Sequence, residues 1–315
     1  MPLPDALQGR LSIPAISAPM FLCSGPDLVV ETCRSGVIGS FPALNQRTTD
    51  GYRDWLVDID RRLGSLKQDG PVAPHAVNLV VHRSNPRLED DLAVTVEHKV
   101  PVVITSLGAN DKVVDAVHSY GGLVFHDVIN IRHAQKAADA GVDGIIAVCS
   151  GAGGHASTLS AFALVPEIRK IFDGTIILGG VISTGAHIAA ARMLGADMAY
   201  IGTRFLATRE CLAPTDQKQM ICVSGAEDIV YTPRISGVFG NFLKESIRNA
   251  GLDPDDISAP ENYNFGTSDD VKAWKQVWAA GQGVGSIDDV PGAAELCARL
   301  GAEYRSAISV ASGWA

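Results

Sequence analysis

Eight short, almost wholly apolar segments recur along the first two thirds of the chain, and they constrain its fold more than any other feature. They are residues 15–20, 37–41, 77–81, 102–108, 122–128, 144–150, 175–181 and 198–203. Apolar runs of this length are typical of strands that are buried on both faces. Amphipathic stretches such as 130–141 and 184–195 lie between them. Because parallel neighbours need a crossover and a helix supplies it, the alternation predicts a helix-covered parallel sheet.

An internal repeat indicates how that sheet is organised. Residues 133–148 resemble residues 187–202: in both, a helical stretch ends at a glycine, an aspartate follows two residues later, and an apolar run begins. Eight such units favour a closed (β/α)8 TIM barrel, with an open doubly wound sheet as the alternative. We expect residues 1–211 to hold the eight strands. We expect 212–280 to be a small, mainly helical insertion without clear strands, and 281–315 to hold the closing helix, at 289–308.

Composition excludes several classes of protein. The 315 residues carry a net charge of −9 without a basic face, which argues against a nucleic-acid partner. No apolar stretch is long enough to span a membrane, and the N-terminus does not resemble a signal peptide. The six cysteines are scattered without a C-x-x-C pair, which favours a reduced cytoplasmic enzyme over a disulfide or zinc protein. A homo-oligomer stays an open alternative.

Two glycine turns predict a phosphate site. In a barrel of this kind, functional groups collect at the carboxyl ends of the strands, and the loops after the last two strands often bind phosphate. Gly179-Gly180 and Gly202-Thr203 stand at those two positions. Glycines let backbone N–H groups face an anion, and the Thr203 hydroxyl could donate as well. The alternative interpretation is that both are merely tight turns.

The segment S-G-A-G-G-H-A-S at 150–157 follows the sixth predicted strand and holds one histidine among small residues. A loop this bare can lie against a flat ligand and direct His155 toward it. Histidine titrates near neutral pH, so it suits general acid or base work. The alternative is a histidine in an ordinary surface loop. We find no metal-binding motif and expect no metal.

Several of these segments match motifs of one family. They are A-P-M at 18–20, V-N-L at 77–79, A-G-G-H at 152–155, G-G at 179–180, and L-G-A-D-x-x-x-x-G-T-R-F-L-A-T-x-E at 194–210. Together they resemble the nitronate monooxygenase family, formerly called 2-nitropropane dioxygenase. The resemblance covers roughly residues 10–210, with a weaker match of A-G-Q-G at 280–283, and the segment 194–210 is its most specific part.

The resemblance implies a barrel enzyme that binds FMN. The FMN phosphate would lie on the two glycine turns, and the flavin ring would lie over residues from the first and third strands. The implied cofactor-binding residues are Ala18, Met20, Asn78, Gly153, Gly179, Gly180, Gly202, Thr203 and Gln282. His155 matches the family's catalytic base, which takes the α-proton from a neutral nitroalkane, whereas an anionic nitronate arrives already deprotonated. The implied reaction passes one electron from the nitronate to the flavin, reduces O₂, and yields a carbonyl compound and nitrite without reduced nicotinamide.

Three residues depart from the family pattern. Ser157 stands where the A-G-G-H motif is usually followed by glycine, and Val181 replaces a glycine of some relatives. Asp127 stands where many relatives have lysine or threonine. Because an acid near the flavin phosphate is unfavourable, we expect Asp127 to point elsewhere or to serve a different substrate. The departures bear on the substrate more than on the fold.

Three other functions stay open from the sequence. The first is an NAD(P)H-dependent flavin reductase, acting on quinones or enoyl thioesters, on the same scaffold. The second is a phosphate-binding barrel of the inosinate dehydrogenase type, which needs a cysteine in the loop after the sixth strand. Here that loop offers His155, and the nearest cysteine, Cys149, lies within an apolar run. The third is a flavin-binding protein without catalysis.

Overall fold

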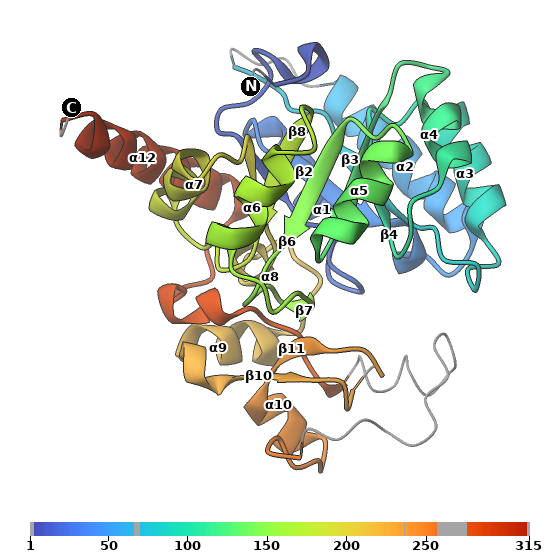
Figure 1. Ribbon diagram of the computed structural model, residues 1–315. Helices are drawn as coiled ribbons and strands as arrows, with labels where there is room; N and C mark the ends of the chain where they lie inside the picture. Colours follow the sequence, from blue (N-terminus) through green and yellow to red (C-terminus); the bar gives the residue numbers. More distant parts are fainter. Residues whose placement is uncertain (1–2, 66–69, 236, 257–275, 314–315) are drawn as a thin grey trace.

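Eight parallel strands close into a barrel in the computed structural model, which describes residues 3–65, 70–235, 237–256 and 276–313 (Figure 1). The strands are β1 (Ala15–Ser17), β2 (Ile38–Pro42), β3 (Ala76–Val80), β4 (Val102–Ser106), β5 (Leu123–Val128), β6 (Gly144–Val148), β8 (Thr175–Gly179) and β9 (Met198–Ile201). Each pairs with the next, and β9 pairs with β1 to close the ring. The predicted (β/α)8 architecture is thereby confirmed, and each observed strand overlaps a predicted one.

Helices follow the strands and cover the barrel (Figure 1). They are α1 (Pro26–Arg34), α2 (Thr49–Gly64), α3 (Leu88–Glu97), α4 (Asp111–His118), α5 (Ile131–Asp139), α6 (Ala161–Arg169), α7 (Gly185–Met193) and α12 (Ala293–Ser312). Several begin at a side-chain cap: Thr48, Asn130 and Thr184 each accept a hydrogen bond from a backbone N–H in the first turn. Within the described ranges, no helix is both long and apolar enough to cross a bilayer.

The final helix, α12, packs against α7 and α1 and completes the outer ring. Gly185 makes this close approach possible, because a Cβ at that position would collide with the backbone of Leu300 and Tyr304. Its N–H also donates to Glu303 Oε2 at 2.7 Å. The chain therefore returns to the barrel wall through α12.

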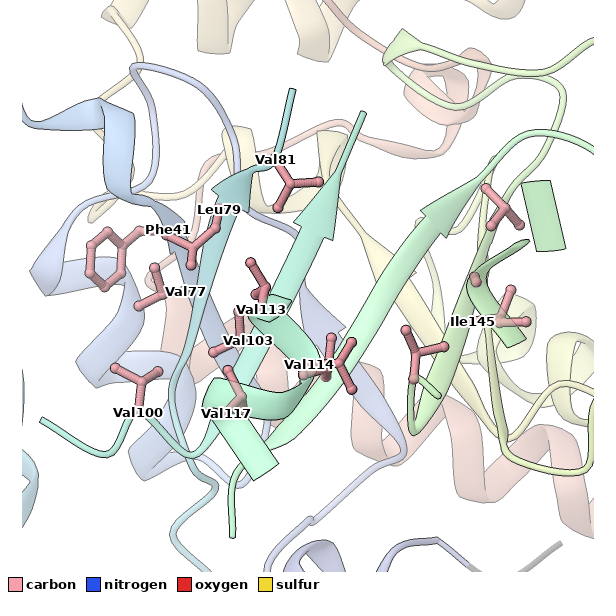
Figure 2. Close-up of a cluster of buried hydrophobic side chains, with 14 of the residues drawn as sticks. Phe41, Val77, Leu79, Val81, Val100, Val103, Val113, Val114, Val117 and Ile145 are labelled. Carbon is pink, nitrogen blue, oxygen red and sulfur yellow. The ribbon is translucent and has the colours of Figure 1, made fainter. Parts of the chain in front are cut away.

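The barrel has apolar layers on both sides of its wall. Figure 2 shows the outer one, where Val77, Leu79 and Val103 of the strands meet Val113 and Val117 of α4. The inner layer fills the barrel and includes Ile16, Ile38, Ala76, Ile104, Phe125, Ile146, Ile177 and Met198. Side chains two residues apart on a strand face the same side. The next inward residues toward the carboxyl end are therefore Ala18, Ser40, Asn78, Ser106, Asp127, Val148, Gly179 and Tyr200.

The segment between β9 and α12 is richer in strands than the sequence suggests. It holds α8 (Thr203–Leu206), α9 (Thr215–Val223), β10 (Ile229–Thr232), β11 (Gly240–Leu243), α10 (Lys244–Asn249) and the 3₁₀ turns η3 (Ala226–Asp228) and η4 (Gln282–Ser286). The expectation that this segment has no strands is wrong, because β10 and β11 form an antiparallel pair. Each has only four residues, and β11 begins with Gly240 and Asn241, which are poor strand formers. Residues 257–275 of this segment lie outside the described ranges.

Candidate active site

The carboxyl ends of the barrel strands face β10, β11 and the short strand β7 (Gly154–His155) (Figure 1). We call this end the mouth of the barrel. Its floor is the inward layer that contains Asn78, Ser106, Asp127, Gly179 and Tyr200. The interior thus changes from apolar side chains to polar ones at this level, although buried polar groups cost free energy unless they find partners. Such a change favours a ligand site over a purely structural core.

A chain of hydrogen bonds crosses three neighbouring strands in the floor. Asn78 Nδ2 donates to Ser106 Oγ at 2.7 Å and to the Ile104 carbonyl at 3.1 Å. Ser106 Oγ in turn donates to Asp127 Oδ2 at 2.7 Å. Burial raises the pKa of Asp127 to about 7, although the Ser106 hydrogen bond opposes that rise. Asp127 is therefore an ionisable group poised near neutral pH, and it lies in the floor rather than at the β8 and β9 turns.

Tyr200 of β9 extends the floor toward the glycine turns. Its ring packs on β8, since a Cβ at Gly179 would lie 3.2 Å from Tyr200 Cδ1. Burial raises the pKa of Tyr200 well above its ordinary value, and the charge of Asp127 contributes to the same shift. The phenol therefore stays neutral. Tyr200 and Ser106 are not among the site residues predicted from the sequence, although strict alternation along β9 and β4 places both side chains inward.

The turns after β8 and β9 present backbone to the mouth. Gly180 has a φ of 128°, a conformation that side-chain-bearing residues rarely adopt. A Cβ at Gly202 would meet only the Ala18 Cβ, at 3.9 Å, so the space beside this glycine is open. Thr203 begins α8, and its Oγ1 accepts a hydrogen bond of 2.9 Å from the N–H of Gly281. The structure thus brings both predicted turns together on adjacent strands.

The segment 281–283 covers the loop after β6. The N–H of Gln282 donates to the Gly151 carbonyl at 2.9 Å, and Ser183 Oγ donates to the Gly283 carbonyl at 2.9 Å. Gly153 lies against this segment, because a Cβ there would be 2.9 Å from the Gly281 nitrogen. Gly153 is therefore required for packing between the two loops, whatever else it contacts. Gln282 itself is exposed at this edge.

The predicted residues of the first loop also lie at the mouth. Ala18 follows β1 and is buried, and Met20 is half-buried. Asn45 holds this loop in place, since its Nδ2 donates to the carbonyls of Met20 and Ser24 at 3.1 and 2.8 Å. Asn45 is not predictable from the sequence, because nothing in the spacing of residues 20 and 45 shows that their loops meet.

His155 lies in a strand rather than in the bare loop that its sequence suggests. In β7, Gly154 and His155 pair with Asn241 and Gly240 of β11, so that β10, β11 and β7 form one antiparallel sheet. Its imidazole is half-buried, and burial lowers the pKa of His155 below the ordinary value. The side chain is consequently neutral at neutral pH, which is the form that can accept a proton.

Two side chains of the 212–280 segment secure the histidine's neighbours. Asn241 Nδ2 donates to the Ala152 carbonyl at 2.7 Å, and the Tyr231 hydroxyl donates to the Ala156 carbonyl at 2.9 Å. The Tyr231 ring stacks on Phe239 with centroids 5.0 Å apart. These contacts join positions about 80 residues apart in the sequence, and no local sequence motif predicts them.

An enzyme of the inosinate dehydrogenase type needs a reactive cysteine in the loop after the sixth strand. The described residues at the mouth do not supply one. Cys149 ends the sixth strand's apolar run and is buried, and burial raises its pKa to about 12. A thiol with such a pKa is a poor nucleophile. Among the described residues, no group of three or more histidine, cysteine or acidic side chains could hold a metal ion.

The residues at the mouth fit a flavin mononucleotide. Gly202 has open space beside it and the first turn of α8 next to it, and Gly180 has a positive φ in the turn of the adjacent strand, an arrangement that suits a phosphate. Ala18 and the floor residue Asn78 supply small and polar contacts suitable for a flat ring. The acidic side chain of the floor, Asp127, is on β5, and β6 separates that strand from β8.

Comparison with known proteins agrees with this geometry. Residues 71–303 match the model of the family described as nitronate monooxygenase. The chain belongs to the nitronate monooxygenase family. Its members are flavin-dependent oxidoreductases, so the barrel is that of an enzyme.

Individual relatives are distant and carry more than one activity. A nitronate monooxygenase from Paraburkholderia phytofirmans is 27% identical over 94% of this chain and 93% of that protein. A "(3aS,4S,5R,7aS)-5-hydroxy-7a-methyl-1-oxo-octahydro-1H-indene-4-carboxyl-CoA dehydrogenase" from Rhodococcus jostii is 24% identical over 75% of this chain, which spans only 64% of that relative. The solved nitroalkane oxidase from Streptomyces ansochromogenes has the same fold, with a TM-score of 0.83, 24% identity and coverage of 97% and 99% of the two chains.

Proposed function

We propose that this nitronate monooxygenase family member uses FMN to oxidise alkyl nitronates, and neutral nitroalkanes after deprotonation, with O₂ to a carbonyl compound and nitrite. The observation that carries the proposal is His155. It is a half-buried, neutral imidazole held in a sheet at the same end of the barrel as two glycine turns suited to a phosphate.

Two groups of residues at the mouth would bind different parts of the cofactor. The turns Gly179-Gly180 and Gly202-Thr203 would take the phosphate through backbone N–H groups and the Thr203 hydroxyl. The residues Ala18, Met20, Asn78, Gly153 and Gln282 would line the ring. When bound, the flavin supplies the electron acceptor that connects substrate oxidation to O₂.

His155 has one proton-transfer role in this scheme. The neutral imidazole accepts the α-proton of a nitroalkane, and positioned general bases typically contribute about 10²–10⁴-fold to such a step. A nitronate needs no base, so it requires only binding and orientation. Burial keeps water away from the imidazole and holds its pKa low, so the base stays available through the neutral range.

One experiment tests the cofactor and the reaction together. Purified protein is examined for bound FMN by absorbance and by mass spectrometry of the released chromophore. It is then mixed anaerobically with a nitronate, NADH or NADPH while flavin absorbance is followed. Rapid bleaching by the nitronate, with nitrite released once O₂ is admitted, is the expected result. A protein that stays colourless after reconstitution with FMN overturns the proposal.

A second candidate is an NAD(P)H-dependent flavin reductase that acts on quinones or enoyl thioesters. The observation in its favour is the relative named as a dehydrogenase of a CoA thioester, which matches most of this chain. In the same experiment, fast bleaching by NADH or NADPH with no response to nitronates would select this activity instead.

The cysteines support a reducing compartment such as the cytoplasm. All six are unpaired, and five are buried. Disulfides form in oxidising compartments, so their absence from a chain with six cysteines fits the cytoplasm better. The expected partners are small molecules, namely the substrate and O₂.

A further inference from the structure

Asp127 has no task in the scheme above, yet its carboxyl group is built into the floor of the mouth. Oδ2 accepts the 2.7 Å hydrogen bond from Ser106. Oδ1 is shut off from solvent and has no hydrogen-bond partner. A buried polar atom without a partner is costly, so its presence in a polar layer calls for an explanation. A ligand seated against the floor would supply the partner that the protein does not.

The surroundings of Asp127 favour its neutral form. Its inward neighbours are Ser106 on β4, Val148 on β6 and, from β9, Tyr200, whose phenol is itself kept neutral by burial. No lysine or arginine of the described ranges pairs with this carboxyl group. His126 bonds through Nδ1 to Thr105 Oγ1 at 2.7 Å, outside the inward layer, and burial lowers its pKa to about 4, so it brings no positive charge.

A neutral carboxylic acid has what the ionised form lacks, namely an O–H donor. Because Ser106 already donates to Oδ2, the proton belongs on Oδ1, which has no other partner. Donation from a buried neutral acid to a negatively charged oxygen is a strong, charge-assisted hydrogen bond. An ionised Asp127 would instead repel the same oxygen.

We propose that Asp127 is an anion-recognition residue: it holds a proton on Oδ1 and donates a hydrogen bond to a negatively charged ligand oxygen in the mouth, so that binding of the anion requires a protonated Asp127. Applied to nitronates, this inference rests on the proposed function. It identifies the preferred ligand as an anion with a compact oxyanion head. A lysine at this position would attract anions over a wide pH range, whereas Asp127 admits them only while it carries its proton.

Binding of a carboxylate that resembles a nitronate tests the inference without turnover. Isobutyrate has the branched shape and two-oxygen head of the 2-nitropropane nitronate and stays ionised above about pH 5.5. Calorimetric titration of the purified, flavin-loaded chain gives its Kd between about pH 6 and about pH 9. We expect a constant Kd at low pH and an increase of about tenfold per pH unit above the pKa of Asp127, as linkage to one proton requires.

Three variants separate recognition from mere structure. Asp127→Asn should bind isobutyrate as tightly as the wild type does at low pH, but without pH dependence, because Ser106 fixes the amide oxygen and leaves the N–H₂ as donor. Asp127→Ala should bind roughly tenfold or more weakly than the wild type does at low pH, and without pH dependence, since a charge-assisted hydrogen bond is lost. Ser106→Ala should move the onset of the pH dependence upward, because it removes the hydrogen bond that lowers the pKa of Asp127.

The exposed Glu167 on α6 offers a matched control, since Glu167→Gln removes a carboxylate far from the floor and should leave the profile unchanged. Retention of the pH dependence in Asp127→Asn would overturn the inference, and so would a wild-type Kd that is independent of pH. If isobutyrate binds as expected but nitronates are not oxidised, the proposed reaction fails while the role of Asp127 stands.

Discussion

The two sides of the barrel mouth are built from different materials. After β8 and β9 the chain has glycines, with an open space beside Gly202. On the opposite side, β3, β4 and β5 offer the side chains of Asn78, Ser106 and Asp127, joined by hydrogen bonds of 2.7 Å. A ligand held by backbone groups is displaced when a side chain is added at the glycine that it contacts. A ligand held by side chains can be bound more or less tightly by changing one of those side chains at a time. Substitutions on the glycine side should therefore act mainly on cofactor binding, and those on the polar side mainly on the ligand and its protonation.

The largest effect is expected from a charge placed on the glycine side. Gly180→Asp should weaken FMN binding on the order of a thousandfold, since like charges about 4 Å apart cost about 4 kcal/mol at the effective dielectric near a protein surface. Gly195→Asp is the control, because Gly195 also has a positive φ, of 105°, but lies at the other end of the barrel. FMN affinity is measured by fluorescence titration of apoprotein. Stoichiometric FMN in Gly180→Asp would show that the phosphate lies elsewhere.

His155 lies between the two sides, and its replacement should affect one substrate form only. His155→Asn should lower kcat/KM for neutral nitroalkanes by about 10²–10⁴-fold and largely spare preformed nitronates. In the wild type, kcat/KM for nitroalkanes should fall only as the pH drops through the pKa of His155, which burial places below its ordinary value. His133→Asn, on the exposed face of α5, should match the wild type. Equal losses on both substrate forms would mean that His155 only positions substrate.

A smaller effect is expected where the 212–280 segment holds the base. Asn241→Ala removes the 2.7 Å hydrogen bond to the Ala152 carbonyl and should cost about 1–2 kcal/mol in the free energy of unfolding. It should also reduce kcat on nitroalkanes, though less than His155→Asn does. Tyr52→Phe removes a buried hydrogen bond to Thr95 between α2 and α3 and serves as the stability-matched control. If both variants keep full activity, the support from β11 is not needed for catalysis.

The smallest effect concerns a strained residue on the glycine side. Val181 has a φ of 56°, which is rare for a β-branched residue and costs about 1–3 kcal/mol. Val181→Gly should raise the free energy of unfolding by about 0.5–1 kcal/mol, because glycine removes the strain but loses more entropy on folding. Lys99 lies at the other end of the barrel and also has a positive φ, of 48°, so Lys99→Gly is the comparison variant for the removal of backbone strain. Denaturant unfolding measures both, and a destabilised Val181→Gly would indicate that the valine packs usefully.

The barrel was predictable because its signals are local. Each strand buries both faces, so its apolar run is visible without knowledge of its neighbours, and the glycine turns follow directly from the strand ends. The strand β7 was not predictable, because its partner β11 is more than 80 residues away and its sequence, Gly154-His155, has no strand character. Asp127 was identified as a departure, and counting along β5 from Phe125 places it inward, but its hydrogen bond to Ser106 depends on the register of β5 against β4. Ser106 needed only strict counting along its strand.

The pairing of β7 with β11 also orders events in time. A ribosome releases the barrel strands up to Ile201 before it makes Gly240–Leu243, so His155 emerges long before the strand that supports it. Because domains tend to form during synthesis and distant contacts close late, the eight strands can pair before His155 reaches its final position. The newly made chain would therefore hold all eight barrel strands while the sheet that carries His155 is still incomplete.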